Sequence, residues 1–395
     1  MPPKFNPMNN IIFFDSEEHR TLLPLTYTKP VSELRIGIHK IHEKWENALG
    51  VSSSNYTQPH LSKLFEMHLT DDNLFILGGL LPSDNLIKAI EDLNEDSSLI
   101  KSGRILAARG SSLNAIKHPK EEINFEYNIQ LIKRPWQIFE LNGAQIEADL
   151  KSIDKTSFSS SLEHTKIIGD PTKIFIHESA TVNAISLNTS AGSVYIGPNA
   201  EVMEGSVIRG PFALCDRSIV KMGAKIYGDS TIGPYCKVGG EIGNSVFQGF
   251  SNKGHDGYLG NSVIGEWCNL GADTNVSNLK NNYSNVKLWD YVKESAIDTE
   301  LTFCGLIMGD HSKTGINTML NTGTMVGVGS NIFGAHFPPK FIPSFSWGSG
   351  TDFMEHDFIK FCSTAEKVMA RRDLTLAREN KSALKWVFQA SSKFR

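Results

Sequence analysis

An aliphatic residue returns every six positions between Ile196 and Val238, and this period limits the possible folds more than any other feature of the chain. The positions concerned are Ile196, Val202, Ile208, Leu214, Val220, Ile226, Ile232 and Val238. A helix repeats about every 3.6 residues and an ordinary strand about every two, so neither explains a strict period of six. A parallel β-helix does, because each hexapeptide forms one short flat side of a coil.

Small residues mark the expected corners of this coil. They follow most of the aliphatic positions by four residues and are Ala200, Ser206, Ser218, Ala224, Ser230 and Cys236. A large side chain would not fit where the chain turns, whereas the aliphatic residues would point inward and stack on their equivalents in neighbouring coils. The pattern therefore predicts a continuous hydrophobic interior.

The repeat is interrupted twice within a predicted β-helix domain of residues 171–340. It begins near Ile176, loses its register after Val238 and recovers it from Met308 onward. Residues 275–301 are polar and irregular, so we expect a loop that leaves the coil. Since the interior of a stacked coil is filled, a ligand must bind outside it, usually under protruding loops. We therefore expect the chemistry at the two interruptions.

Three further segments complete the predicted organisation. Residues 8–150 are expected to form an α/β domain, with Met8 as a possible true start, and residues 151–170 read as a linker rich in Ser, Thr, Lys and Glu. Residues 341–395 are expected to form helices, with a basic pair at Arg371 and Arg372, that cap or brace the end of the coil.

The α/β prediction rests on alternating strand and helix patterns. Strands are expected at 11–14, 73–78 and 105–108, and helices at 38–49 and 86–93. Residues 125–139 are less regular, since Arg134-Pro135-Trp136 breaks the pattern. Strands that alternate with helices favour a mostly parallel sheet.

The composition is typical of a cytoplasmic enzyme that acts on small molecules. The 39 Lys and Arg residues nearly balance the 43 Asp and Glu residues, so no global field attracts nucleic acid or an anionic membrane. No apolar run approaches the roughly 20 residues of a membrane span, and the start has no apolar signal core. The five cysteines show no CxxC spacing, which favours reduced, packed thiols.

His255 is the strongest candidate for a catalytic side chain. It lies in the first interruption, beside Gly254 and close to Gly257 and Tyr258, in a loop that can present an imidazole. Imidazole titrates near neutral pH and can take a proton from an amine or a hydroxyl group. The alternative, a surface histidine without a role, stays open on the motif alone.

Three motifs resemble the acetyltransferase domain of the bifunctional N-acetylglucosamine-1-phosphate uridyltransferase/glucosamine-1-phosphate acetyltransferase family. They are G-H-D-G-Y-L-G at 254–260, I-G-E-W-C-N-L-G-A at 264–272 and T-N-V-S-N at 274–278. The resemblance implies a left-handed β-helix, with nearly the whole chain similar to a variant described from Bacteroidetes-type bacteria.

The resemblance also implies roles for individual residues. His255 would be the general base that deprotonates the sugar amine, and Tyr258 and Asn269 would bind the amino-sugar phosphate. Asn278 would orient the substrate amine or the thioester, and acetyl-CoA would lie along the coils after Met308. The family is a homotrimer in which each site lies between neighbouring β-helices.

The sequence departs from the family pattern at several positions. Leu279 stands where the family has a tyrosine, and Asn252 stands where it has a lysine, with Lys253 one place later as a candidate substrate ligand. The phosphate-binding basic residues have no certain equivalent. Arg209 is the best candidate, and Lys221 and Lys225 are others; each is alternatively a solubilising residue.

The segment R-T-L-L-P-L-T-Y-T-K-P at 20–30 resembles the signature of sugar-1-phosphate nucleotidyltransferases. By this resemblance Arg20 would stabilise a triphosphate and Lys29 would reach the sugar phosphate, with Mg²⁺ required. The glycine-rich turn that normally precedes the arginine is replaced by D-S-E-E at 15–18, which puts carboxylates where phosphates should meet backbone N–H groups. The metal ligands are unknown, and Asn142 and Asp149 are the only candidates.

The favoured hypothesis is an enzyme of nucleotide-sugar synthesis with two activities. It would acetylate glucosamine 1-phosphate with acetyl-CoA and then join the product to the uridylyl group of UTP. Three alternatives stay open: a nucleotidyltransferase whose β-helix is only a trimerisation stalk, an acetyltransferase with an inactive N-terminal domain, and a non-enzymatic scaffold.

Overall fold

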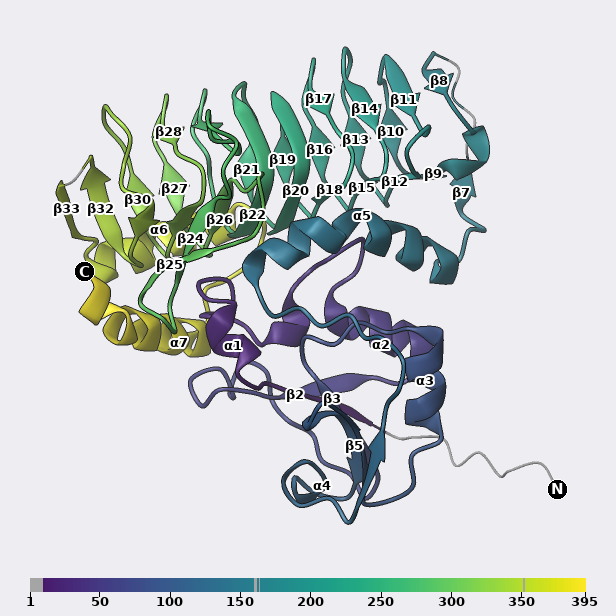
Figure 1. Ribbon diagram of the computed structural model, residues 1–395. Coiled ribbons are helices and arrows are strands. Elements are labelled where there is room, and N and C mark those ends of the chain that lie inside the picture. The colour runs from purple at the N-terminus through teal and green to yellow at the C-terminus, as the bar shows by residue number, and fades with distance from the viewer. Residues whose placement is uncertain (1–9, 160–161, 163, 351) are drawn as a thin grey trace. The chain divides into compact units, whose positions relative to one another are not determined.

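The computed structural model describes residues 10–159, 162, 164–350 and 352–395 (Figure 1). Residue 8, where the first domain was predicted to begin, lies outside these described residues. The chain forms two compact units. The first unit contains residues 10–19, 29–34 and 39–133, and the second contains residues 20–28, 35–38 and 134–395. Two short segments of the predicted first domain therefore belong to the second unit.

The first unit contains a six-stranded mixed sheet. Its strands, in spatial order, are β2 (Ser53–Tyr56), β1 (Ile11–Phe14), β3 (Asn73–Leu77), β5 (Arg104–Gly110), β4 (Ser97–Lys101) and β6 (Glu121–Asn124). The β2, β1 and β3 strands are parallel, as predicted, whereas β5 is antiparallel to both β3 and β4. The expectation of a mostly parallel sheet is therefore wrong for β5, which follows β4 through a two-residue turn and so has to reverse direction.

The helices of the first unit match the predicted helical patterns. They are α2 (Ile41–Leu49), α3 (Asp84–Glu91) and α4 (Asn114–Lys117), while the short α1 (Glu18–Thr21) follows β1. All residues of β1 and β3 are buried, which explains their unbroken apolar runs. Trp45 of α2 is fully buried, and its indole N–H donates to the Leu80 carbonyl at 2.8 Å.

The second unit is built around a parallel β-helix with three sides. Val194 pairs with Phe212 and Phe212 with Ser230, so the chain advances by 18 residues in one coil of three hexapeptides. The first side contains β9 (Ile174–His177), β12 (Val194–Ile196), β15 (Phe212–Leu214), β18 (Ser230–Ile232), β26 (Leu306–Met308), β29 (Thr324–Val326) and β31 (Phe341–Ile342). β20 (Glu241–Gly249) and β22 (Tyr258–Glu266) are long enough to bend from the third side onto this first side. The short β7 (Phe158–Ser159) pairs with β9 at the start of the coil.

The other two sides are made of shorter strands. The second side contains β10 (Thr181–Val182), β13 (Glu201–Val202), β16 (Ile219–Val220), β19 (Lys237–Val238), β21 (Asn252–Lys253), β27 (Lys313–Thr314), β30 (Asn331–Ile332), β32 (Ser346–Ser349) and β33 (Asp352–Glu355). The third side contains β8 (Lys166–Ile168), β11 (Ser186–Asn188), β14 (Val207–Arg209) and β17 (Lys225–Ile226), followed by the first halves of β20 and β22. β23 (Asn275–Val276) and β28 (Met319–Leu320) pair with each other.

The interior of the coil confirms the prediction from the six-residue period. All eight aliphatic residues between Ile196 and Val238 are at most 3% exposed and belong to one hydrophobic cluster. The six small residues predicted at the corners are also buried. The interior is thus filled by stacked side chains, and only the outer faces can bind a ligand.

One corner carries a stack of aromatic rings that the sequence patterns did not predict. Tyr235 stacks on Phe250 at 5.1 Å between ring centroids, Phe250 on Trp267 at 4.3 Å, and Trp267 on His311 at 6.2 Å. We call these four residues the aromatic ladder. All four have positive φ, between 55° and 63°, which costs a non-glycine residue about 1 kcal/mol or more. Stacking and burial of the rings offset this strain.

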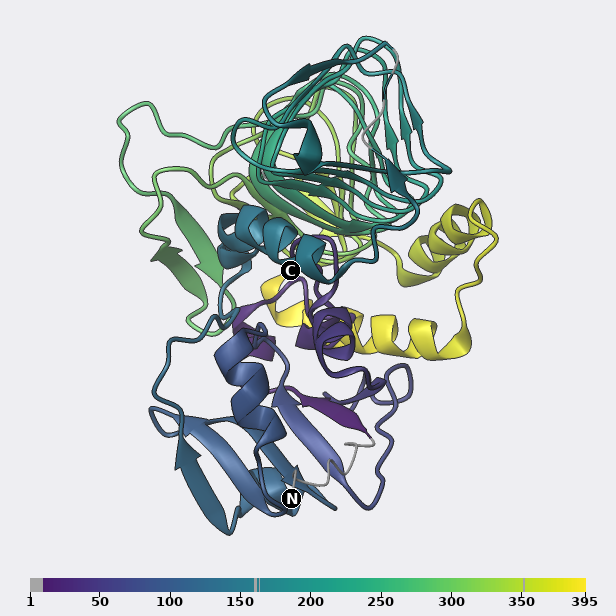
Figure 2. The same cartoon turned by 90° about the vertical axis from the view of Figure 1, so that its right-hand side faces the viewer.

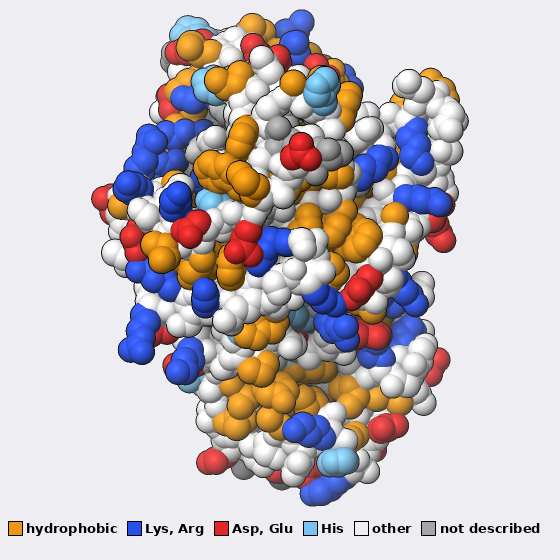
Figure 3. All heavy atoms as spheres, turned by 90° about the vertical axis from the view of Figure 1, so that its left-hand side faces the viewer, with side chains coloured by type: hydrophobic (Ala, Val, Ile, Leu, Met, Phe, Trp, Pro, Cys, Tyr) orange, Lys and Arg blue, Asp and Glu red, His pale blue; other side chains and the backbone are white. Residues whose placement is uncertain are grey.

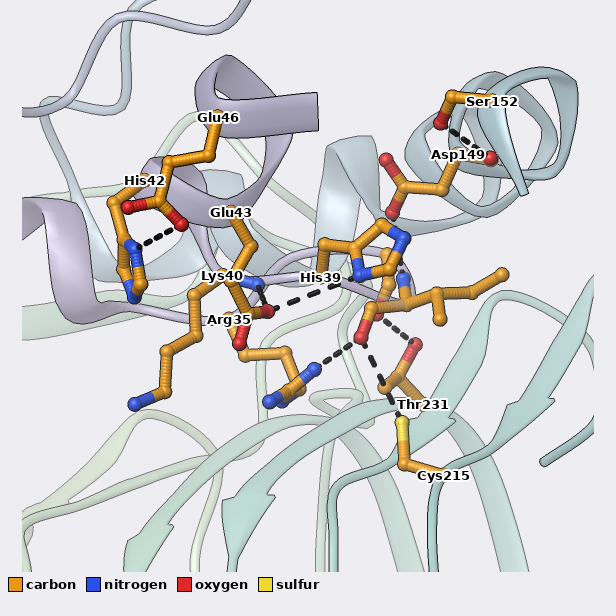
Figure 4. A network of polar contacts seen from close by, with 12 residues as sticks. Arg35, His39, Lys40, His42, Glu43, Glu46, Asp149, Ser152, Cys215 and Thr231 are labelled. Carbon is orange, nitrogen blue, oxygen red and sulfur yellow. Dashed lines mark hydrogen bonds and ion pairs between the residues drawn. The ribbon is translucent and has the colours of Figure 1, made fainter. Parts of the chain in front are cut away.

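Helix α5 (Pro135–Ser152) covers the first side of the coil through contacts with β15, β18, β20 and β22 (Figure 2). It begins inside the segment that was expected to be irregular, because Pro135 suits the first turn of a helix. Residues 35–38 are bonded to both the helix and the coil. Asp149 accepts from the Ile38 N–H at 2.8 Å, and Thr231 donates to the Gly37 carbonyl at 3.0 Å (Figure 4).

Residues 275–301 leave the coil, as predicted, but they are not wholly irregular. They contain an antiparallel hairpin of β24 (Lys287–Asp290) and β25 (Ser295–Asp298), which projects beside the coil in Figure 2. Trp289 of the hairpin stacks on Phe341 with 4.2 Å between ring centroids. The alternation of exposed and buried residues in β24 was too short to stand out in the sequence.

The C-terminal segment forms α6 (Phe358–Ala370) and α7 (Arg378–Ala390), and both brace the last coils, as predicted. The Phe345 ring packs against Phe361 at 5.0 Å and Phe388 at 5.1 Å between ring centroids. Figure 3 views this end of the second unit, where hydrophobic side chains gather; Trp347 and Met354 are among the exposed ones. Within the described part of the chain, no helix has the length and apolar character needed to cross a membrane.

Candidate functional site

His255 lies at a corner between the second and third sides of the coil. β21 ends at Lys253 and β22 begins at Tyr258, so residues 254–257 form the turn between them. Gly257 has φ of +114°, and a Cβ atom there would lie 2.3 Å from the Thr274 carbonyl oxygen, so only glycine fits. The turn leaves His255 exposed, as the sequence predicted.

Lys253 supports this turn from below. Its side chain is 1% exposed, and its ammonium donates to the carbonyls of Gly239 at 3.3 Å, His255 at 3.2 Å and Gly257 at 2.6 Å. Burial lowers the pKa of Lys253 to about 8. The structure therefore differs from the prediction that Lys253 binds substrate: its ammonium is directed at the backbone and holds the His255 turn.

A cavity of about 550 Å³ lies on the second side of the coil, and we call it the second-side cavity. His255 and Asn269, two of the predicted residues, both line it. Phe250 and Trp267 of the aromatic ladder form part of its wall, and α6 contributes residues from the opposite side. Lys221, a weaker candidate, also lines this cavity, whereas Lys225 is exposed on the third side.

A second cavity, of about 450 Å³, lies on the third side, and we call it the third-side cavity. It brings together Arg209, Tyr258 and Asn278, the remaining residues predicted for the acetyltransferase site. The Asn278 amide donates to the Tyr258 hydroxyl at 2.9 Å and to the Asn261 side-chain oxygen at 2.8 Å. Burial raises the pKa of Tyr258, so its hydroxyl stays protonated at neutral pH. Asn261 was not predicted, because nothing in its sequence surroundings distinguishes it.

The predicted acetyltransferase residues are thus divided between two faces of one chain. His255 and Asn269 face the second side, whereas Arg209, Tyr258 and Asn278 face the third. The corner at residues 254–257 separates the two groups. Only three positions separate His255 from Tyr258 in the sequence, but the chain turns between them.

In the first unit, Asp15 lies at the carboxyl end of β1 beside a cavity of about 470 Å³. Asn55, Tyr56 and Thr57, at the carboxyl end of the neighbouring β2, also line this cavity. The Asp15 carboxylate accepts from the Thr57 hydroxyl at 2.5 Å and from the Val31 N–H at 3.0 Å. Burial nevertheless raises the pKa of Asp15 to about 6. We call this the Asp15 cavity.

The acidic residues that replace the glycine-rich turn are neutralised within the first unit. Arg104 of β5 pairs with both Glu17 and Glu18, and Glu18 is 2% exposed. These carboxylates therefore have a structural partner and do not face an open phosphate site. The sequence showed the acidic substitution but not the arginine, which lies more than 80 residues further along the chain.

The two residues predicted to bind the nucleotide and the sugar phosphate differ in their surroundings. Arg20 is exposed and belongs to the second unit, whereas Lys29 is 5% exposed and belongs to the first. Residues 20–28 pack on the β-helix of their own unit, where the Thr28 hydroxyl donates to Asp310 at 2.7 Å. Burial of Lys29 does not fit its predicted contact with a sugar phosphate.

Asn142 and Asp149, the candidate metal ligands, are engaged by the backbone. Asn142 accepts from the Gly37 N–H at 2.7 Å and donates to the Asp229 carbonyl at 2.9 Å, and Asp149 accepts from Ile38. Both side chains therefore anchor residues 35–38, which corrects their proposed role. Among residues 10–159, 162, 164–350 and 352–395, no group of three His, Cys, Asp or Glu side chains is arranged to hold a metal ion.

Comparison with known proteins supports this division of the chain. Residues 11–157 match the family model described as sugar nucleotidyl transferase. The N-terminal part of the chain is nucleotidyltransferase-like. Over 269 residues the chain is 29% identical to a bifunctional sugar-1-phosphate nucleotidylyltransferase/acetyltransferase of Sulfurisphaera tokodaii, covering 64% of this chain and 59% of that protein. It is 34% identical over 90 residues to the bifunctional protein GlmU of Methanococcus aeolicus, covering 23% of this chain and 21% of the relative.

The match therefore spans less than two thirds of the length of these relatives. Among solved structures, the polysialic-acid-specific acetyltransferase NeuO aligns with 14% identity and a TM-score of 0.28, over 53% of this chain and 94% of that one. The predicted resemblance to bifunctional nucleotidyltransferase/acetyltransferases is confirmed at modest sequence identity. The predicted fold class, a nucleotidyltransferase-like α/β domain followed by a hexapeptide β-helix with terminal helices, is also confirmed.

Proposed function

We propose that the chain catalyses two consecutive steps of nucleotide-sugar synthesis in the cytoplasm. The β-helix would transfer acetyl from acetyl-CoA to glucosamine 1-phosphate, and the first unit would transfer uridylyl from UTP to the resulting N-acetylglucosamine 1-phosphate. The observation that carries the first step is the exposed His255 side chain at the edge of the second-side cavity, on a turn held by Lys253. The relatives named for both activities support the pairing.

The acetyl transfer would use His255 as a general base. The neutral imidazole accepts a proton from the sugar amine while the amine nitrogen attacks the thioester carbonyl of acetyl-CoA. The C–N bond forms, the C–S bond breaks, and the proton passes from the imidazolium to the departing coenzyme A thiolate. Asn269 lines the same cavity and can contact the acceptor sugar during this step.

The division of the predicted residues supports a site shared between chains of a homotrimer. Arg209, Tyr258 and Asn278 cannot reach the second-side cavity of their own chain, because the corner at residues 254–257 lies between. In a closed cyclic assembly, the third side of one copy can face the second side of the next. Each site would then combine His255 and Asn269 from one copy with Tyr258 and Asn278 from its neighbour.

The nucleotidyl transfer would take place in the first unit at the Asp15 cavity. Ligands of open α/β sheets bind outside the carboxyl ends of the strands, and this is where Asp15 and Thr57 lie. UTP would enter with its own Mg²⁺, because the described residues offer no evident set of metal ligands. The phosphate of N-acetylglucosamine 1-phosphate would attack the α-phosphorus of UTP and release pyrophosphate.

A second candidate function keeps only the acetyl transfer. Burial of Lys29, together with the packing of residues 20–28 on the β-helix, favours an N-terminal domain that is structural. The two candidates differ in whether the chain uses a nucleoside triphosphate at all.

A product assay separates these candidates. The chain is supplied with acetyl-CoA, glucosamine 1-phosphate and each of four nucleoside triphosphates with Mg²⁺, and the products are identified by mass spectrometry. We expect acetylated sugar phosphate in every reaction and a nucleotide sugar with UTP. His255→Ala should lower the acetyl-transfer rate by about 10²- to 10⁴-fold without affecting uridylyl transfer to preformed N-acetylglucosamine 1-phosphate. Asp256→Ala, at the neighbouring exposed position, is the matched control, and an unchanged acetyl-transfer rate in His255→Ala would exclude the general-base role.

A further inference from the structure

The second-side cavity is lined by cations and by no carboxylate. Lys221, Lys237 and Lys313 come from three coils of the β-helix, and Arg371 and Arg372 follow α6. No Asp or Glu is found among the lining residues, all of which belong to the described part of the chain. In a chain with more acidic than basic residues, such a concentration of positive charge is unexpected.

The two arginines are placed at the cavity by the C-terminal extension. α6 ends at Ala370, and its buried face, which includes Phe361, packs against the aromatic ladder at His311 with 5.8 Å between ring centroids. Val368 from the last turn of α6 also lines the cavity. The helix therefore forms a wall opposite the coil, and its end carries the guanidinium groups.

Helix-end complementarity does not explain the whole cluster. Arginines at a helix C-terminus can interact favourably with the free carbonyls of the last turn. Lys221 and Lys237, however, lie on the coil and have no helix end to complement. The pKa of Lys237 is lowered by its burial and then by the neighbouring charges of Arg372, Lys221 and Arg371, with only a small opposing effect from Glu201. These cations therefore repel one another.

Other cations on the same helices are paired with carboxylates. Lys381 of α7 pairs with Glu366 of α6 at 2.5 Å, and Lys393 pairs with Glu294. The chain thus places counter-charges beside α6 and α7 where it neutralises lysines. At the cavity it leaves the positive charges facing a space large enough for a substrate group.

We propose that the second-side cavity binds a phosphoryl group of an acetyl-transfer substrate through Arg371 and Arg372 of the C-terminal extension, assisted by Lys221 and Lys237. Guanidinium groups bind phosphate oxygens in a bidentate manner, and paired cations are stabilised when the anion arrives. This inference rests on the proposed acetyl transfer, since His255 lines the same cavity. The phosphoryl group belongs either to the amino-sugar phosphate or to coenzyme A, and binding measurements separate these sources.

Isothermal titration calorimetry on the full chain tests the proposal without requiring turnover. The ligands are coenzyme A, pantetheine, glucosamine 1-phosphate and glucosamine, titrated into the wild type, the double variant Arg371→Ala/Arg372→Ala and Arg378→Ala. Arg378 is exposed at the start of α7 and does not line the cavity, so its variant is the matched control. Thermal unfolding of each variant checks that the fold is retained.

We expect the double variant to bind one phosphorylated ligand about 10- to 100-fold more weakly than the wild type and the control, as the loss of charge-assisted hydrogen bonds predicts. A loss for coenzyme A alone assigns the coenzyme as the source, and a loss for glucosamine 1-phosphate alone assigns the sugar. Equal affinities of the double variant and the wild type for both ligands would overturn the proposal, as would a wild type that binds neither. If instead binding is lost as expected but the wild type forms no acetylated product, the proposed function fails and the phosphoryl site stands.

Discussion

The Lys253 ammonium donates to the Gly257 carbonyl at 2.6 Å and thereby ties the end of β21 to the turn that carries His255. The same ammonium also bonds to the carbonyl of His255 itself. A buried lysine is thus the main polar support of the candidate general base. Sequence similarity to a substrate-binding lysine one place away concealed this role.

Lys253→Met should loosen the His255 turn. Three carbonyls would lose a charged donor, so we expect a loss of about 1–3 kcal/mol in the free energy of unfolding and faster amide exchange at residues 254–257. The acetyl-transfer kcat should fall more than the KM changes, because the base is misplaced while the cavity remains. Lys166→Met, at an exposed lysine of β8, should change none of these quantities.

The Lys253 contribution should also depend on pH. Its pKa is about 8 in the folded chain and about 10.5 when unfolded, so between these values the unfolded state binds more protons. The stability of the wild type relative to Lys253→Met should therefore rise as the pH increases from about 8 toward 10. Urea unfolding of both chains at pH 7.5 and pH 9.5 measures this difference, and a constant difference would contradict the assignment.

Asp15→Asn should stabilise the first unit at neutral pH. The folded pKa of about 6 exceeds the unfolded value of 3.8, so the wild type loses stability as the pH rises from about 4 to 6. Asparagine keeps the shape without the buried charge, and we expect a gain of about 1–2 kcal/mol above pH 6 that disappears below pH 4. Chemical unfolding at several pH values provides the test, with Asp71→Asn, an exposed carboxylate of the same unit, as the control.

Trp267 provides a test of the aromatic ladder. Trp267→Ala should cost about 3–5 kcal/mol, since it removes a buried ring but keeps a non-glycine residue at a φ of 63°. Trp267→Gly should cost about 1 kcal/mol less, because glycine adopts this conformation without strain. At Val220, which lies in an ordinary strand of the coil, the order should be reversed, with glycine less stable than alanine. Equilibrium unfolding of the four variants decides whether positive φ is a real source of strain at this corner.

Mixing two inactive chains tests the shared site. His255→Ala and Asn278→Ala remove residues from opposite sides of the corner, so each variant alone should acetylate poorly. If neighbouring copies complete each site, then co-refolding equal amounts should restore about a quarter of the wild-type activity, because random trimers place two intact faces together at that frequency. A site contained within one chain would show no recovery above the separate variants.

The periodic part of the fold was predictable because its cause is local. Each hexapeptide buries one aliphatic residue and turns at one small residue, so the coil, its interior and its corners are written in short repeats. The two interruptions were visible for the same reason. They correctly indicated where His255 and Asn278 would lie outside the filled interior.

Arrangements between distant segments depended on the tertiary structure. The partnership of Arg104 with Glu17 and Glu18, and the anchoring of residues 35–38 by Asn142 and Asp149, join positions more than 80 residues apart. Nothing in either local sequence specifies such a partner. The candidate metal ligands were misassigned for this reason, since a buried polar residue on a helix can bond to backbone as well as to an ion.

The sequence alone thus determined a hexapeptide β-helix and identified His255 as an exposed residue at its first interruption. Only the tertiary structure decided which face each site residue occupies. A turn of four residues sends His255 to the second side and Tyr258 to the third, because side-chain direction in a coil depends on the corner and on stacking against neighbouring coils. The same stacking brings Arg371 and Arg372 beside a cavity formed more than 100 residues earlier in the chain.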